Sequence, residues 1–221
     1  MTDEARTPRP ATRWILVAVA ILAIVAVAFA LGRFTAFGAS AAPVRPSTVS
    51  AEAGFARDMQ VHHEQAVRMA MEIYRKTSDD ELRILSHDIA TAQAGQRGEM
   101  YGWLVEWGLS QTGGPLMSWM SDSSAHQHDP ATATEQELRD EMGMATDAQL
   151  AELEAATGSE ADCLFLELMI RHHQGAIPMA QAVVELGQEP RVLTVAQSII
   201  TGQSSEIDAM RSMQTRLSCA A

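Results

Sequence analysis

The feature that most constrains the fold of this chain is an internal repeat whose two copies lie 110 residues apart. A histidine doublet stands at the centre of each copy, as His62-His63 and as His172-His173. The residues around the doublets recur as well: Phe55 with Phe165, Met59 with Met169, Ala66 with Ala176, Met69 with Met179 and Ala70 with Ala180. Because the repeat keeps Met and His together with apolar positions, it indicates a shared chemical task as well as a shared fold.

The repeat runs without a gap, with residues 55–107 matching residues 165–217. Its later matches are Ile89 with Ile199, Thr91 with Thr201, Gln93 with Gln203 and Met100 with Met210. Each copy is about 50 residues long, the size of a helical hairpin. Two hairpins predict a four-helix bundle, since a solenoid needs at least three repeats. We therefore expect an all-α fold built from two duplicated helical hairpins.

Turn and capping signals divide the bundle into three parts. Thr134-Glu-Gln-Glu137 and Thr146-Asp-Ala-Gln149 match the capping-box pattern, which predicts two short helices between the repeats. The predicted bundle covers residues 51–217, with repeat 1 at about 51–108, a linker with short helices at 109–158 and repeat 2 at about 159–217.

The N-terminal segment has the pattern of a membrane signal. Arg6, Arg9 and Arg13 precede an uncharged apolar run at residues 14–31, and Arg33 closes it. At about 1.5 Å per residue, this run is just long enough to cross a hydrocarbon core of about 30 Å. Arginines before the run place the N-terminus in the cytoplasm.

These signals predict a single-pass protein of the cell membrane with its C-terminal domain extracytoplasmic. Residues 1–33 form a cytoplasmic tail and transmembrane helix that contacts the membrane, and residues 34–50 form a flexible tether. The alternative is a cleaved signal sequence, with Ala39-Ser40-Ala41 as the cleavage site, which leaves a secreted or periplasmic protein.

The net charge and the two cysteines indicate which kinds of partner to expect. The chain carries 28 acidic and 16 basic side chains, a net charge of −12, so nucleic acid is not an expected partner and a metal ion is favoured. The two cysteines, Cys163 and Cys219, fall at neighbouring ends of an antiparallel hairpin. An oxidising location predicts a disulfide between them, and the alternative is a pair of thiolate ligands for a soft metal.

Helical periodicity places His62 and His172 within apolar stripes, with His63 and His173 at their flanks. Imidazole is a leading ligand for copper and zinc, and thioether selects Cu(I). The sequence contains no Glu-x-x-His, which a di-iron carboxylate bundle requires. We therefore predict a copper site with Cu(I) preferred and Cu(II) or Zn(II) as alternatives. The competing interpretation is that Met and His simply pack in the core.

The predicted metal ligands are His62, His63, His172, His173, Met59, Met69, Met169 and Met179. Further groups are expected either to hold these ligands in place or to add to them: Gln93, Gln203, Glu206, Met100, Met210, His126 and His128. Of these, His126 and His128 belong to a second candidate site in the linker, together with Met117 and Met120.

The second repeat resembles the DUF305 family, a domain of unknown function. The resemblance is carried by residues 165–180, Phe-x3-Met-Ile-x-His-His-Gln-Gly-Ala-Ile-Pro-Met-Ala, by residues 196–210 and by residues 143–150. It covers about 50–217 and is looser in the first repeat. The resemblance implies a ferritin-like bundle, an extracytoplasmic location and, as in some members, copper binding by the histidine doublets.

Together these features predict a membrane-tethered extracytoplasmic protein that binds copper for buffering, resistance or delivery to a copper-handling protein partner. The alternatives are a metal-dependent oxidase that uses the same site and a structural envelope module that binds no metal. The sequence shows no Gly-x-Ser-x-Gly nucleophile motif, so any catalysis would belong to the metal.

Overall fold

The computed structural model describes residues 10–38, 45–125 and 133–219. The chain divides into two compact units, residues 1–45 and residues 46–221. The first unit contains helix α1 (Pro10–Gly38), on which Trp14, Phe29 and the large apolar side chains described between them are exposed. No helix within the described ranges combines the length and apolarity needed to span a membrane. The transmembrane helix expected from the sequence is therefore not confirmed.

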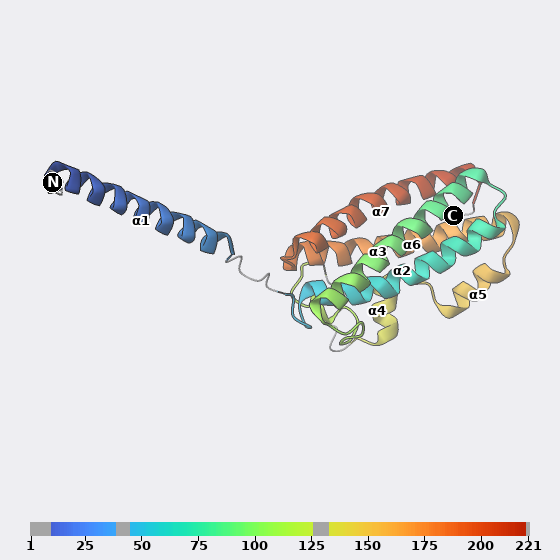
Figure 1. The fold of residues 1–221 in the computed structure, drawn as a ribbon. Helices are drawn as coiled ribbons and strands as arrows, with labels where there is room; N and C mark the ends of the chain where they lie inside the picture. The colour runs from blue at the N-terminus through green and yellow to red at the C-terminus, as the bar shows by residue number, and fades with distance from the viewer. Residues whose placement is uncertain (1–9, 39–44, 126–132, 220–221) are drawn as a thin grey trace, which may run out of the picture. The chain divides into compact units, whose positions relative to one another are not determined.

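The second unit is built on four long helices (Figure 1). They are α2 (Ala51–Lys76), α3 (Asp80–Trp107), α6 (Gly158–Leu186) and α7 (Pro190–Arg216). Helix α2 packs along α3, α6 packs along α7, and the two hairpins meet where α2 contacts α6. The described parts of the chain contain helices and no strand, which confirms the all-α prediction.

Local sequence signals fix the ends of these helices. The Ser50 side chain accepts a hydrogen bond from the Ala53 backbone N–H at the start of α2, and Asp79 accepts one from Leu82 at the start of α3. Gly108 ends α3 in the left-handed conformation that glycine adopts without strain. Helix α7 begins at Pro190, whose missing N–H costs nothing in the first turn.

The described part of the linker between the hairpins holds three short helices, η1 (Ser118–Met120), α4 (Glu135–Glu141) and α5 (Asp147–Ala155). Both predicted capping boxes are present, at Thr134 and at Thr146. The segment between α4 and α5 is tied to α2, because the Gln65 side-chain amide bonds both backbone groups of Ala145, at 2.9 and 2.7 Å.

Cys163 and Cys219 form the predicted disulfide, with their Cα atoms 5.4 Å apart. The bond joins the second turn of α6 to Cys219, three residues after the end of α7, so it closes the second hairpin. Because both sulfur atoms are used in this bond, the alternative of two thiolate metal ligands is wrong for this structure.

Candidate metal centre

Four completely buried imidazoles lie where α2 meets α6. The rings of His62 and His172 stack on one another, with centroids 3.6 Å apart and planes 35° apart. His63 lies 6.3 Å from His62 and His173 lies 6.4 Å from His172, each at an interplanar angle of 53°. The near-identical values show that the duplication extends from the sequence to the geometry of the histidines.

Three of the four imidazoles have a hydrogen-bond partner at Nε2. The His62 Nε2 lies 2.9 Å from the Met142 carbonyl oxygen, and the His63 Nε2 lies 2.8 Å from Gln96 Oε1. The His173 Nε2 lies 2.6 Å from Glu206 Oε2. Among the described residues, the Nδ1 atoms of all three are buried without a partner, and neither nitrogen of His172 has one.

Burial favours the neutral form of three of these imidazoles, those of His62, His63 and His172. Desolvation, together with the neighbouring His63, lowers the pKa of His62 to about 3. Desolvation also lowers the pKa of His63 to about 4 and that of His172 well below its usual value. A neutral imidazole has a lone pair for a metal ion, whereas a protonated one has none.

The buried methionines divide into two groups on either side of the histidine layer. One apolar cluster contains the methionines Met59, Met100, Met117, Met120, Met142, Met144 and Met179, and the other contains Met69, Met169, Met210 and Met213. Each group therefore takes sulfur atoms from both repeats. The structure does not gather the four predicted methionine ligands into one set, because Met59 and Met179 lie in one cluster and Met69 and Met169 in the other.

A family model described as "Domain of unknown function (DUF305)" matches residues 52–214. The chain belongs to the DUF305 family. None of the curated proteins compared with it matches. The family membership confirms the resemblance seen in the second histidine repeat.

Three solved structures show the same fold. A DUF305 protein from Streptomyces coelicolor, named as a secreted protein, is 37% identical, with a TM-score of 0.68 over 78% of this chain and 95% of that one. A DUF305 fragment from Deinococcus radiodurans is 30% identical, with a TM-score of 0.62 over 77% and 99%. The Cu(II)-bound form of CopM is 28% identical, with a TM-score of 0.56 over 76% and 97%.

Two buried amides add to the polar character of this DUF305 core. Gln93 of α3 and Gln203 of α7, which correspond in the repeat, are 3% and 4% exposed. Neither their amide nitrogens nor their amide oxygens have a hydrogen-bond partner within the described parts of the chain. Buried polar groups normally have hydrogen-bond partners. These amides and the unpaired imidazole nitrogens are therefore groups that a bound ion or polar ligand would satisfy.

Sequence reasoning missed two groups of the site. Gln96 is the counterpart of Glu206 at the repeat offset, so the duplication itself contained the signal that would have found it. The Met142 carbonyl contacts His62 through the backbone, and no side-chain pattern encodes such a contact. The predicted linker residues His126 and His128 lie outside the described residues.

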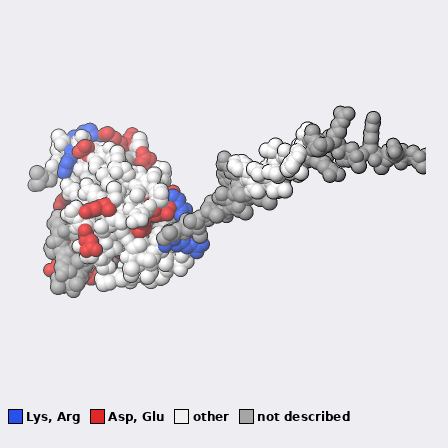
Figure 2. Space-filling view, turned by 90° about the vertical axis from the view of Figure 1, so that its left-hand side faces the viewer, with Lys and Arg blue, Asp and Glu red and all other residues white. Residues whose placement is uncertain are grey.

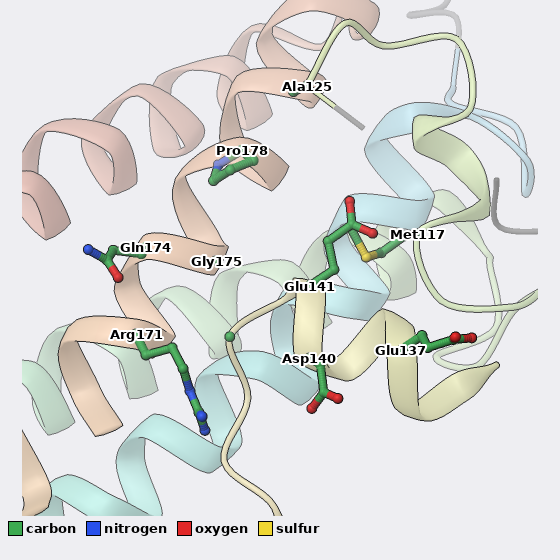
Figure 3. A pocket seen from close by; sticks show the side chains of 10 residues that line it. Met117, Ala125, Glu137, Asp140, Glu141, Arg171, Gln174, Gly175 and Pro178 are labelled. Atoms are coloured by element: carbon green, nitrogen blue, oxygen red, sulfur yellow. The ribbon is translucent and has the colours of Figure 1, made fainter. Parts of the chain in front are cut away.

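A cavity of about 470 Å³ opens between α4 and α6, next to the histidine-bearing turn of α6 (Figure 3). Its lining includes Glu137, Asp140 and Glu141 from α4, and Arg171, Gln174, Gly175 and Pro178 from α6. Because Pro178 has no N–H, it cannot donate to the Gln174 carbonyl as a helix residue normally does. Carboxylates at a cavity mouth raise the local concentration of cations.

In the described ranges, no group of three or more His, Cys, Asp or Glu side chains is arranged to hold a metal ion. A site for a hard or intermediate ion with three such ligands is therefore not preformed there. The donors that the core does offer are imidazole Nδ1 atoms and flanking thioether sulfurs. This combination suits a soft ion such as Cu(I), which accepts few ligands of the N and S type.

Proposed function

We propose that this DUF305 protein binds copper outside the cytoplasm, with Cu(I) as its preferred ion, and serves in copper buffering, resistance or delivery. The observation that carries the proposal is the layer of four buried histidines whose Nδ1 atoms have no hydrogen-bond partner among the described residues. Burying a polar atom without a partner costs free energy, and a bound metal ion would remove that cost.

The donor set supports copper over other metals. The ligands in this proposal are His62, His63, His172 and His173, with Met59 and Met179 on one side and Met69 and Met169 on the other. Thioether favours Cu(I), while Cu(II) and Zn(II) bind imidazole alone. The relative CopM was solved in a Cu(II)-bound form, which supports copper as the first ion to test.

Two observations support a location outside the cytoplasm. The Cys163–Cys219 disulfide is of a kind that persists in oxidising compartments. The Streptomyces coelicolor relative is named as a secreted protein. A retained N-terminal anchor and a cleaved signal sequence both lead to this location, and a copper-handling partner there would receive the ion.

The test is a Cu(I) competition titration against a chromophoric chelator, using the full chain without a histidine tag. We expect the wild type to remove Cu(I) from the chelator and the variant H62A/H63A/H172A/H173A to lose that ability. The matched control is H87A, because His87 is an exposed histidine of α3 outside the layer. Its affinity for Cu(I) should equal that of the wild type.

Equal and weak binding by the wild type and the fourfold variant would overturn the proposal and leave the histidines as packing residues. Circular dichroism of each variant separates lost binding from lost folding. Where the fourfold variant fails to fold, the single variants H172A and H63A replace it, since each leaves three imidazoles in the core. A preference for Zn(II) over Cu(I) in parallel titrations would contradict the assignment of the metal.

A further inference from the structure

The two repeats hold their flanking imidazoles with different chemical groups. In repeat 1 the partner of His63 is the Gln96 side-chain oxygen at 2.8 Å, and in repeat 2 the partner of His173 is the Glu206 carboxylate at 2.6 Å. The two partners occupy corresponding positions, each 33 residues after its histidine. The two repeats therefore place the acceptor at a similar distance from the imidazole, but the acceptor is a neutral amide in repeat 1 and a carboxylate in repeat 2.

The two acceptors differ in how firmly they fix the imidazole. A carboxylate oxygen accepts a hydrogen bond, so the contact with Glu206 places a proton on the Nε2 of His173, and in the neutral imidazole the lone pair is then on Nδ1. A side-chain amide presents an acceptor on one side and a donor on the other, and rotating it by about 180° exchanges them. Gln96 therefore accommodates either neutral form of His63, while Glu206 accommodates one.

The central histidines, His62 and His172, do not remove this difference between the two repeats. The Met142 carbonyl is also an obligate acceptor, so His62 donates from Nε2 and presents its lone pair at Nδ1. His172 has no partner at either nitrogen and stacks on His62. Since these two rings are in contact, both halves share them. The flanking residues His63 and His173 are what distinguish one half from the other.

We propose that Glu206 is a positioning residue that locks His173 as an Nδ1 donor and makes the second repeat the tighter of two unequal half-sites. A carboxylate bonded to the far nitrogen fixes ring orientation and raises the basicity of the ligating nitrogen. The neutral amide of Gln96 provides neither effect in full. A soft cation therefore occupies the His173 side first. This inference rests on the proposed copper-binding function.

The chain offers a reciprocal pair of variants for the test. E206Q gives repeat 2 the partner that repeat 1 has, and Q96E gives repeat 1 the partner that repeat 2 has. Both changes keep the side-chain length and a hydrogen-bond acceptor. Gln96 and Glu206 are only half-buried, so neither variant creates a cavity in the core. Circular dichroism of both variants should match that of the wild type.

The first readout is nitrogen-15 NMR of the imidazoles in the metal-free full chain. We expect His173 in the Nε2–H form in the wild type, and a mixture of the two neutral forms in E206Q. A residue that only packs against His173 would not shift this ratio. Finding His173 in the Nδ1–H form in the wild type would overturn the inference.

The second readout is Cu(I) competition together with NMR at less than one equivalent of Cu(I). In the wild type, the His173 signals should shift before those of His63. E206Q should weaken Cu(I) binding about 10-fold or more, the range typical of lost groups behind a ligand, and Q96E should not weaken it. The double variant E206Q/Q96E should make His63 the first to shift.

Unchanged affinity in E206Q, or simultaneous shifts of His63 and His173, would overturn the inference while copper binding itself stands. Conversely, a wild type that binds no Cu(I) would overturn the proposed function, and the NMR measurement on the metal-free protein would still decide whether Glu206 locks His173. The two failures are therefore distinguishable.

Discussion

At the scale of single residues, the buried titratable groups give the metal-free protein a definite pH dependence. Folding lowers the pKa values of His62, His63 and His172 through burial. Unfolded histidine takes up a proton below about pH 6.5, so the unfolded state binds more protons than the folded state at mildly acidic pH. The stability that these groups contribute is present above about pH 6.5 and is lost as the pH falls towards their folded values.

One buried carboxyl group acts in the opposite direction. Burial raises the pKa of Asp58 to about 6, although this carboxyl accepts hydrogen bonds from the Met117 backbone and the Trp119 indole. Between about pH 4 and 6 the folded state therefore keeps a proton on Asp58 that the unfolded state has released. Three histidines outweigh this single carboxyl group, so the net effect in that range is loss of stability with acid.

We predict that the free energy of unfolding of the metal-free chain falls by about 3 kcal/mol per pH unit between about pH 6 and 4. This value corresponds to about two protons taken up on unfolding, at about 1.4 kcal/mol per proton and pH unit. Urea denaturation across this range measures the slope. The variant H63Q removes one titrating group and should reduce the slope by about 1.4 kcal/mol per pH unit, which corresponds to one proton. An H63Q slope equal to that of the wild type would contradict the assignment.

At the scale of elements, sequence patterns predicted the helices well because capping and periodicity are local properties. Thr134 and Thr146 each begin a helix through a capping box, as their sequence contexts indicated. The helical stripes also placed His62 and His172 at the core. The grouping of Met59 with Met179 and of Met69 with Met169 was not predicted, since it depends on which end of α6 meets which end of α2.

The path of the linker could not be predicted from sequence patterns either. The linker crosses α6 at the histidines, where a Cβ on Gly175 would lie 2.0 Å from the Met142 carbonyl oxygen. Gly143 has a φ of +69° and fits against the Arg171 backbone. Helical periodicity does not distinguish Gly175 from any other small helix residue. Its contact with the distant Met142 backbone leaves no local sequence pattern from which it could be predicted. The close approach is what brings the Met142 carbonyl to His62.

We predict that G175A destabilises the protein by about 1–3 kcal/mol, the range for overpacking a filled site. Alanine raises helix propensity by about 1 kcal/mol, so the steric clash must outweigh that gain. The control is G95A in α3, where a Cβ would meet nothing within 4 Å and stability should rise by up to about 1 kcal/mol. Thermal unfolding of both variants measures the contrast. A stabilised G175A would mean that the linker does not press on α6.

At the scale of the whole molecule, the two hairpins share a fold but are closed by different chemistry. The Cys163–Cys219 bond closes the α6–α7 hairpin. At the corresponding end of the α2–α3 hairpin, the Arg57 guanidinium donates to the Ser110 carbonyl at 3.0 Å and to the Thr48 carbonyl at 2.7 Å. The first closure is covalent and the second is a set of hydrogen bonds, so oxidation state affects one half of the bundle directly.

Asp and Glu are scattered over the face of the bundle shown in Figure 2, and Lys and Arg lie near its edges. Ion pairs join the two hairpins. Arg191 of α7 contacts Glu106 of α3 at 2.8 Å, and the Arg216 guanidinium of α7 contacts both oxygens of Asp79 at the start of α3. This contact holds the pKa of Asp79 at about 2. Because Arg216 and Cys219 lie near one another in sequence, the end of α7 is fixed both to α6 and to the first hairpin.

We predict that C163S/C219S lowers the free energy of unfolding by about 4 kcal/mol and leaves copper affinity unchanged. The stability loss follows from a cross-link that spans 56 residues of chain, whose closure restricts the unfolded state. Copper affinity should persist because Cys163 precedes His172 by nine residues, about 14 Å along α6. Thermal unfolding and Cu(I) competition on the same sample measure both quantities. A folded variant with weaker copper binding would show that the histidine layer depends on the closed hairpin, and that the two ends of α6 are coupled through the helix.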